Sequence, residues 1–294
     1  MRRTWRSLCY CRSRAAFLHL QGFPCTIRVM RNARAWTGGG WPVPTLEENR
    51  APFSHRSGAT GVLLIHGFTG SPGELRPLAE AFAGAGFAVE VPVLAGHCRT
   101  IEEMNRTRYR DWMASGLGAY RDLRARTSRV AVYGHSMGAL IALQLAAAQD
   151  VWAVVAAGAP MYLKNRHARL AGVAGVFWPV MRERVPENPM IDPYLGGYRG
   201  MTPVRAAGSL VRFIGDTRRV LPRVTAPVLV QQGRLDLTVR PESAHYIYNR
   251  IASRHKLLQW YERSGHMLTV DAERERVWRD AISFVQSLEG ERRE

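Results

Sequence analysis

The stretch 129-RVAVYGHSMGALIALQLAAAQ-149 decides the fold of this chain. Its first residues, 129–133, form a short β-branched apolar run that is typical of a buried strand. Residues 137–149 are rich in Ala and Leu and predict a helix. Between them, 134-GHSMG-138 matches G-x-S-x-G, the pattern of a sharp strand-to-helix turn that leaves the Ser136 hydroxyl exposed at its tip. A Gly-Ser turn with no chemical role is the alternative interpretation of this motif.

Strands and helices alternate on both sides of this stretch. The periodicity predicts strands at 62–65, 87–91, 129–133, 151–157, 227–231 and 256–261, and helices at 71–83, 108–126, 137–149, 241–251 and 271–288. Such alternation indicates βαβ units, and therefore an α/β fold with a mostly parallel central sheet flanked by helices. Residues 161–204 contain no strand-like run and interrupt the alternation. They are predicted to form an insertion, either a lid or a helical connection without a gating role.

A serine hydroxyl needs a base to remove its proton, and this base is usually a histidine oriented by a carboxylate. In a fold with this turn, the expected chain order is Ser, then Asp, then His, each in a loop after a strand. Asp236 follows the strand predicted at 227–231, and His266 follows the strand predicted at 256–261. We therefore predict that Ser136 is the nucleophile, that His266 is its general base and acid, and that Asp236 is the charge partner of His266.

Other acidic and histidine residues fit these roles less well. They belong to predicted helices or the insertion, precede the relevant strand or follow His266 in the wrong order: Asp192, Asp216, Asp271, His245 and His255.

Ester cleavage also requires donors for the negative charge that develops on the carbonyl oxygen. The backbone N–H after the nucleophile, that of Met137, is one predicted donor. The second is expected from the loop 66-HGFTG-70, and we assign it to the N–H of Phe68. For His66, a structural role in holding this loop is favoured over a contact with substrate. The same interpretation applies to His135, the neighbour of the nucleophile.

Seven stretches together resemble the α/β-hydrolases, and more narrowly the small bacterial carboxylesterases and monoacylglycerol lipases with serine aminopeptidase-like domains. They are VLLIHGFTGSPGELRPLAE, VPVLAGH, YGHSMGALIALQLA, GAPMYLK, APVLVQQGRLD, ESAHYIYNRI and WYERSGHMLTVDAE. The resemblance runs from about residue 52 to 288. It implies the α/β-hydrolase fold with a small helical cap at about 161–204 that forms an apolar acyl pocket. It also assigns Ser136, Asp236 and His266 to a triad and the amides of Phe68 and Met137 to the oxyanion hole.

Two positions depart from the usual family pattern. Cys98 stands where the family usually has Gly after the Gly-His of the AGH loop, and Ala139 replaces a second Gly after the nucleophile turn.

The expected substrates are short- to medium-chain acyl esters, including monoacylglycerols. A thioesterase, lactonase or aminopeptidase on the same triad remains an alternative, as does a non-catalytic binding protein on this scaffold.

Composition narrows the remaining classes. The chain has 294 residues, of which 46% are hydrophobic and 22% charged, so a mainly disordered chain is excluded. No apolar run approaches the roughly 20 residues of a membrane helix, which predicts a soluble protein. The formal charge is +17, and only Lys164 and Lys256 among the 41 basic residues are lysines. Because arginines outside the N-terminus alternate with acids, we expect a solvated basic surface and no nucleic-acid partner.

The N-terminal residues have a different character. Residues 1–46 contain no acid and are rich in Arg, so we expect 1–50 to be an extension outside the fold. A start codon placed too far upstream, a disordered tail, a transit peptide and a signal peptide are the alternatives. The hydrolase core is then 51–160 and 205–290, with the cap at 161–204.

Compartment, cofactors and partners are less sharply indicated. Beyond the N-terminus Cys98 stands alone, which favours a reducing, cytoplasmic compartment. No metal or nucleotide motif is present, so we expect no cofactor, and we expect a monomer acting on a small acyl ester.

Overall fold

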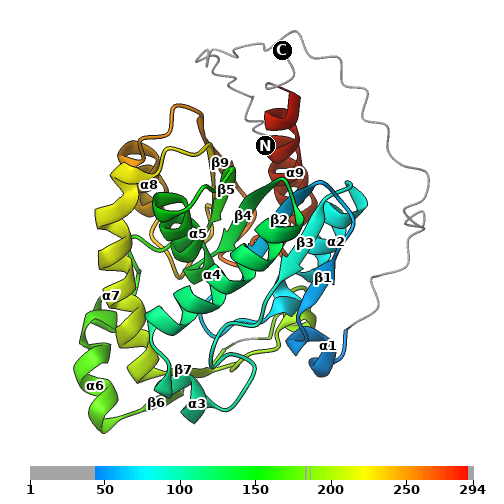
Figure 1. Ribbon diagram of the computed structural model, residues 1–294. Coiled ribbons are helices and arrows are strands. Elements are labelled where there is room, and N and C mark those ends of the chain that lie inside the picture. Colours follow the sequence, from blue (N-terminus) through cyan, green and yellow to red (C-terminus); the bar gives the residue numbers. More distant parts are fainter. Residues whose placement is uncertain (1–43, 183, 186, 291–294) are drawn as a thin grey trace, which may run out of the picture. The chain divides into compact units, whose positions relative to one another are not determined.

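The computed structural model of the chain describes residues 44–290 apart from 183 and 186. Within this part, a seven-stranded sheet forms the centre, in the order β1-β3-β2-β4-β5-β8-β9 (Figure 1). Its strands are β1 (Phe53–His55), β2 (Thr60–Ile65), β3 (Ala88–Val91), β4 (Arg129–His135), β5 (Ala153–Ala157), β8 (Val228–Gly233) and β9 (Lys256–Tyr261). All neighbouring strands are parallel except β1, which pairs antiparallel with β3. The predicted mostly parallel α/β sheet is confirmed.

Helices cover both faces of this sheet (Figure 1). They are α2 (Arg76–Gly84), α4 (Tyr109–Arg126), α5 (Met137–Ala148), α7 (Val204–Val220), α8 (Glu242–Arg250) and α9 (Arg274–Gly290). Two shorter helices, α1 (Leu46–Arg50) and α3 (Ile101–Arg106), lie at one end of the sheet (Figure 1). The side chains of β2 alternate between two cores. Leu63 and Ile65 pack with α4, α5, α7 and α8, whereas Val62 and Leu64 pack with α2 and α9. Because both faces are covered, β2 is a continuous apolar run rather than an alternating one.

The insertion after β5 contains a short antiparallel ribbon that was not predicted from the sequence. It comprises α6 (Ala171–Phe177), β6 (Val180–Arg182), β7 (Met201–Pro203) and two 3-10 turns at Arg166–Leu170 and Asp192–Tyr194. The expectation that 161–204 has no strand is therefore wrong. The reason is length: each strand has three residues, too few to show an alternating pattern, and the two pair across a separation of about twenty residues.

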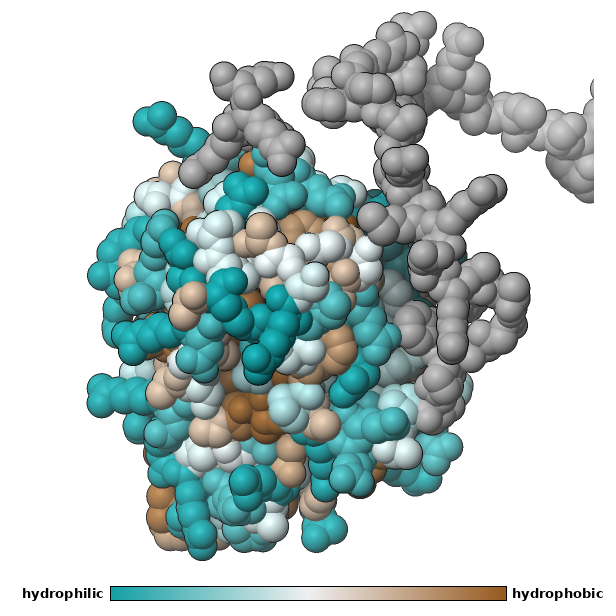
Figure 2. Space-filling model, turned by 45° about the vertical axis from the view of Figure 1, so that its right-hand side comes forward, coloured by the Kyte–Doolittle hydropathy of each residue, from teal (hydrophilic) through white to brown (hydrophobic). Residues whose placement is uncertain are grey.

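The insertion contacts the rest of the described chain at several points. Tyr198 donates its hydroxyl to the carbonyl of Gly96 at 2.8 Å, and the N–H of Gly196 donates to Ser71 Oγ at 3.1 Å. Large apolar side chains of the cap are more than half exposed: Leu170, Val173, Val176, Phe177 and Trp178. On the face drawn in Figure 2, hydrophobic residues gather in a patch surrounded by hydrophilic ones. No helix in the described part of the chain is long and apolar enough to span a bilayer.

The N-terminal boundary of the packed chain lies before residue 51. Residues 1–43 of the predicted extension lie outside the described residues. Residues 46–50 form α1, which Thr45 caps in a box with Glu48. Asn49 is buried and donates its side-chain amide to the carbonyl of Pro193 at 2.7 Å, and Arg50 Nε donates to that of Gly196 at 2.9 Å. These long-range bonds to the cap leave no signal in the local sequence.

Candidate active site

Ser136 lies at the turn between β4 and α5, as the motif predicts. Its backbone has φ 53° and ψ −116°, and its N–H donates to the carbonyl of Ala157 at 2.8 Å. The flanking glycines are required by close packing. A Cβ on Gly134 would lie 2.3 Å from the carbonyl oxygen of Gly138, and one on Gly138 would lie 2.0 Å from that of Ile65. The turn therefore holds the Ser136 side chain at the carboxyl end of the sheet.

His266 lies between Ser136 and Asp236. Its Nε2 is 2.9 Å from Ser136 Oγ, and its Nδ1 is 2.8 Å from Asp236 Oδ2. Since Asp236 Oδ2 accepts a hydrogen bond from Nδ1–H, the neutral imidazole leaves Nε2 as the acceptor of the hydrogen bond from the serine hydroxyl. Residues separated by 130 positions in the chain thus form one continuous hydrogen-bonded chain of three side chains.

Asp236 is completely buried, and both of its carboxylate oxygens accept hydrogen bonds from protein donors. Its Oδ1 accepts the backbone N–H groups of Thr238 and Val239, each at 2.8 Å, and Gln232 Nε2 donates to Oδ2 at 2.9 Å. Burial disfavours the carboxylate, but the facing His266 and the two backbone donors outweigh it and hold the pKa of Asp236 below its usual value. A carboxylate that is ionised at neutral pH at this place stabilises a protonated His266.

The loop 66–70 approaches the serine from the neighbouring strand. A Cβ on Gly67 would lie 3.3 Å from Ser136 Cβ, and the next but one residue, Thr69, adopts the left-handed conformation with φ 60°. Among the described residues, the N–H groups of Phe68 and Met137 have no hydrogen-bond partner. Two backbone donors beside the serine are therefore available to a ligand.

His66 is buried and engaged within the structure. Its Nδ1 is 3.0 Å from the carbonyl of Gly67, and its Nε2 accepts the N–H of Leu94 at 3.3 Å. Burial lowers the pKa of His66, so the ring is neutral with its proton on Nδ1. These contacts fit the predicted role of holding the loop.

Glu74 was not identified from the sequence, although it is buried beside the loop. Its Oε1 accepts the N–H groups of Gly67 and Ser71, each at 3.2 Å, and its Oε2 lies 3.6 Å from His135 Nδ1. The pattern 71-SPGE-74 was an available signal because Ser-x-x-Glu marks a helix-capping box. Nothing in that pattern indicates the contact with His135.

The competing acids and histidines have partners elsewhere. Asp271 accepts the N–H of Gly265 at 2.6 Å and so shapes the loop before His266. Asp216 accepts the hydroxyl of Tyr109 at 2.8 Å, and the ring of His245 lies 5.3 Å from that of Trp260.

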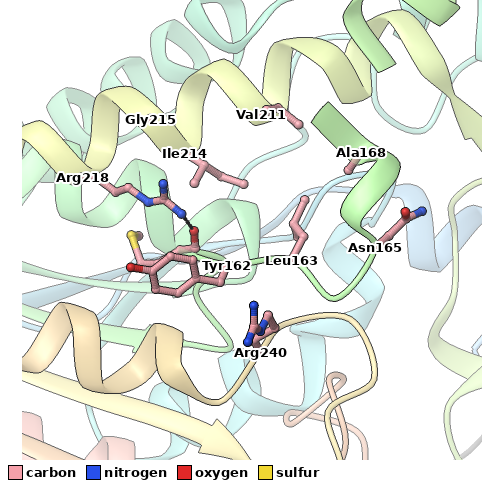
Figure 3. Close-up of a pocket in the computed structure, with 10 residues that line it drawn as sticks. Tyr162, Leu163, Asn165, Ala168, Val211, Ile214, Gly215, Arg218 and Arg240 are labelled. Carbon is pink, nitrogen blue, oxygen red and sulfur yellow. Dashed lines mark hydrogen bonds between the residues drawn. The ribbon is translucent and has the colours of Figure 1, made fainter. Parts of the chain in front are cut away.

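A cavity of about 290 Å³ lies between the start of the insertion and α7 (Figure 3). Its walls come from residues 161–168, from α7 and from Arg240, and the triad does not line it. Val211, Ile214 and Leu163 give it an apolar side. Arg218 donates to the carbonyl of Met161 and lies over the ring of Tyr162 at 4.6 Å. The wall of this cavity thus combines apolar side chains with the guanidinium groups of Arg218 and Arg240. No group of three metal-ligating side chains occurs in the described part of the chain.

The fold and this arrangement of residues define an α/β-hydrolase, and comparison with known proteins narrows the class. A family model described as serine aminopeptidase, S33, matches residues 59–273. A carboxylesterase of Bacillus subtilis (strain 168) is 30% identical over 239 residues, which cover 81% of this chain and 97% of the relative. A thermostable monoacylglycerol lipase of Bacillus sp. (strain H-257) is 33% identical over 237 residues, which cover 79% of this chain and 93% of that relative.

Solved structures agree with these relatives. A structure described under two metagenome-derived lipolytic enzymes, LipS and LipT, superposes with a TM-score of 0.76 at 30% identity, covering 81% of this chain and 98% of the other. A monoacylglycerol lipase of Paleococcus ferrophilus superposes with a TM-score of 0.67 at 20% identity, covering 81% and 99%, and supports the fold. The chain belongs to the serine aminopeptidase S33 family, and within it resembles carboxylesterases and monoacylglycerol lipases.

Proposed function

We propose that the protein hydrolyses carboxylic esters through an acyl-enzyme on Ser136. The observation that carries this proposal is the continuous chain Ser136–His266–Asp236, with 2.9 and 2.8 Å between hydrogen-bonding atoms. The N–H groups of Phe68 and Met137, which have no hydrogen-bond partner within the described part of the chain, support the same chemistry. The names of the relatives, a carboxylesterase and a monoacylglycerol lipase, favour ester bonds.

In the first half of the reaction, His266 Nε2 takes the hydroxyl proton as Ser136 Oγ attacks the ester carbonyl carbon. The N–H groups of Phe68 and Met137 donate to the oxygen that becomes negative in the tetrahedral intermediate. The C–O bond to the alcohol then breaks, and the His266 Nε2 proton passes to the leaving alcohol.

In the second half, His266 takes a proton from water, which attacks the acyl carbon and forms a second tetrahedral intermediate. The bond to Ser136 Oγ breaks, the proton returns to the serine, and the carboxylic acid leaves. Asp236 remains ionised throughout and stabilises the imidazolium form of His266 in both halves.

Short- to medium-chain acyl esters, including monoacylglycerols, are the proposed substrates. We also propose that residues 161–204 act as a cap over a core of 51–160 and 205–290, and that the enzyme works without a cofactor. The cap is too short to suggest a large interfacial lid, which disfavours triacylglycerols.

A fluorophosphonate probe followed by peptide mapping tests the proposal. We expect labelling of Ser136 in the wild-type protein, and loss of both labelling and p-nitrophenyl butyrate hydrolysis in Ser136→Ala. A folded wild-type protein that is neither labelled nor active would instead favour the binding-protein alternative.

A second candidate is aminopeptidase activity on the same triad, which the family description favours. Initial rates on p-nitrophenyl butyrate, an acyl-CoA and an aminoacyl anilide separate these possibilities. Dominant turnover of the anilide would contradict the esterase proposal.

A further inference from the structure

A carboxylate and an imidazole lie buried directly behind the candidate site. Glu74 and His135 are 2% and 1% exposed, and Glu74 Oε2 is 3.6 Å from His135 Nδ1. Glu74 ends the 3-10 turn Pro72–Glu74, whereas His135 ends β4 and precedes the nucleophile. The proposed reaction uses neither group. Burying two charged groups costs much of their hydration, so a buried ion pair often adds little to stability. We therefore look for a role of this pair other than stabilising the fold.

Glu74 holds the loop that carries the Phe68 donor. Its Oε1 accepts the N–H groups of Gly67 and Ser71, each at 3.2 Å, so one carboxylate oxygen fixes the loop on both sides of Phe68. Gly70 leaves the space for this contact, because a Cβ there would lie 1.8 Å from Glu74 Oε1. The direction of the Phe68 N–H therefore depends on the place of this carboxylate.

The same pair holds the loop of the proposed base. His135 Nε2 lies 2.9 Å from the backbone carbonyl of His266, and the Thr269 hydroxyl donates to the backbone carbonyl of Glu74 at 2.7 Å. The rings of His135 and His266 are 5.1 Å apart. Two hydrogen bonds thus connect residues 266–269 to the pair.

Charge favours the arrangement that makes all of these bonds. Burial disfavours protonated His135, but the facing Glu74 outweighs it and raises the pKa of His135 above its usual value. Burial likewise disfavours ionised Glu74, but His135 and the Gly67 N–H outweigh it, so the pKa of Glu74 is lowered. In the doubly protonated ring, one N–H faces Glu74 and the other is directed to the carbonyl of His266.

We propose that Glu74 and His135 are positioning residues, which hold the Phe68 N–H and the His266 ring in place around Ser136. The inference rests on the proposed function and deepens it. We expect the pair to affect the free energy of the transition state and not the binding of substrate. A misplaced donor or base raises the activation barrier without removing contacts to the substrate.

The first test replaces Glu74. Glu74→Leu removes the acceptor, and we expect kcat on p-nitrophenyl butyrate, per titrated active site, to fall about tenfold to a hundredfold. KM should change less than about twofold, and the inhibition constant of a butyl boronic acid should rise by the factor lost in kcat/KM. Glu74→Gln keeps an oxygen acceptor and should recover most of the activity. Glu80→Gln, on the outer part of α2, is the matched control and should not change kcat.

The second test replaces His135 and remains informative if Glu74→Leu does not fold. His135→Leu removes the donor to the His266 carbonyl and should lower kcat about tenfold with KM unchanged. His135→Gln keeps a donor and should recover activity. Thermal unfolding of each variant shows whether the native fold is retained.

The outcomes separate this inference from the proposed function. If the wild-type enzyme labels at Ser136 and both leucine variants keep wild-type kcat and boronate affinity, the positioning role is wrong. Equal losses in the leucine and rescue variants, or a rise in KM alone, would also contradict it. If wild-type Ser136 neither labels nor hydrolyses the ester, the proposed function itself fails.

Discussion

Ser136 occupies a backbone conformation that side chains rarely adopt, with φ 53°. The conformation is held because the residues on both sides pack without space for a larger group, and because the Ser136 N–H bonds Ala157. Local strain of this kind is typical of functional sites. At the scale of single residues, the site depends on the protonation of a few buried groups as much as on their positions.

Asp236→Asn tests the orientation of His266. The replacement keeps the shape of the side chain but places an amide donor opposite His266 Nδ1. This favours the tautomer with its proton on Nε2, which cannot accept the proton of the Ser136 hydroxyl. We expect kcat on p-nitrophenyl butyrate to fall by about 10⁴ with little change in KM or in the melting temperature. A loss below about tenfold would mean that Asp236 does not orient the base.

The Glu74–His135 pair should make stability depend on pH. Glu74 has a lowered pKa, so its contribution is present above its usual value of 4.5 and is lost as the pH falls through its folded pKa. His135 has a raised pKa, so its contribution is present below its usual value of 6.5 and is lost as the pH rises through its folded pKa. The joint contribution should therefore be largest between about pH 4.5 and 6.5.

Urea unfolding of the wild type and of Glu74→Gln/His135→Gln at several pH values measures this effect. We expect the difference in unfolding free energy to peak within that window. A difference that is flat from pH 4 to 8 would show that the two groups are not an ion pair.

At the scale of elements, β2, β4 and α5 must approach closely for the nucleophile turn to form. Gly134 and Gly138 provide this approach, and the backbone of Ile65 at the end of β2 is the nearest neighbour of Gly138. Both glycines belong to the motif, so the sequence indicates the contact between strand and helix. The third partner, the end of β2, comes from a residue more than seventy positions earlier.

Gly138→Ala tests this approach. Its Cβ would lie 2.0 Å from the carbonyl oxygen of Ile65, a backbone atom that cannot move without shifting β2. We expect a loss of about 2–4 kcal/mol in unfolding free energy and a large fall in kcat. Gly118→Ala is the control, because a Cβ on Gly118 in α4 meets nothing within 4 Å. Equal melting temperatures of the two variants would contradict the packing argument.

At the scale of the whole molecule, the N-terminal end of the described residues is part of the packed structure. Every residue named in the site lies within 44–290, and α1 is bonded to the insertion through Asn49 and Arg50. The arginines of the core include surface ion pairs such as Arg129 with Glu289 at 3.2 Å. These pairs are consistent with a solvated basic surface and are individually weak.

Two truncations separate the extension from the fold. Removal of residues 1–43 should leave kcat/KM unchanged. Removal of 1–50 also removes the buried Asn49 and two hydrogen bonds to residues 193 and 196. We therefore expect the free energy of unfolding to fall by about 2 kcal/mol and the melting temperature to fall by several degrees. Identical melting curves would show that α1 contributes nothing. Salt-dependent DNA retention of the full chain, lost in either truncation, would revive the nucleic-acid alternative.

The sequence by itself determined the alternation of strands and helices, the glycines of the nucleophile turn, and the order of Ser136, Asp236 and His266. These features can be predicted because the hydrophobic period, the size of the turn and the position of each loop depend on residues that are close together in the chain. Only the tertiary structure decided the rest: the three-residue ribbon of the cap, the packing of α1, and the partners of Glu74 and His135. The bond from Thr269 to Glu74 spans 195 residues. Such a contact arises when the sheet brings separate loops to one edge, and no local pattern specifies it.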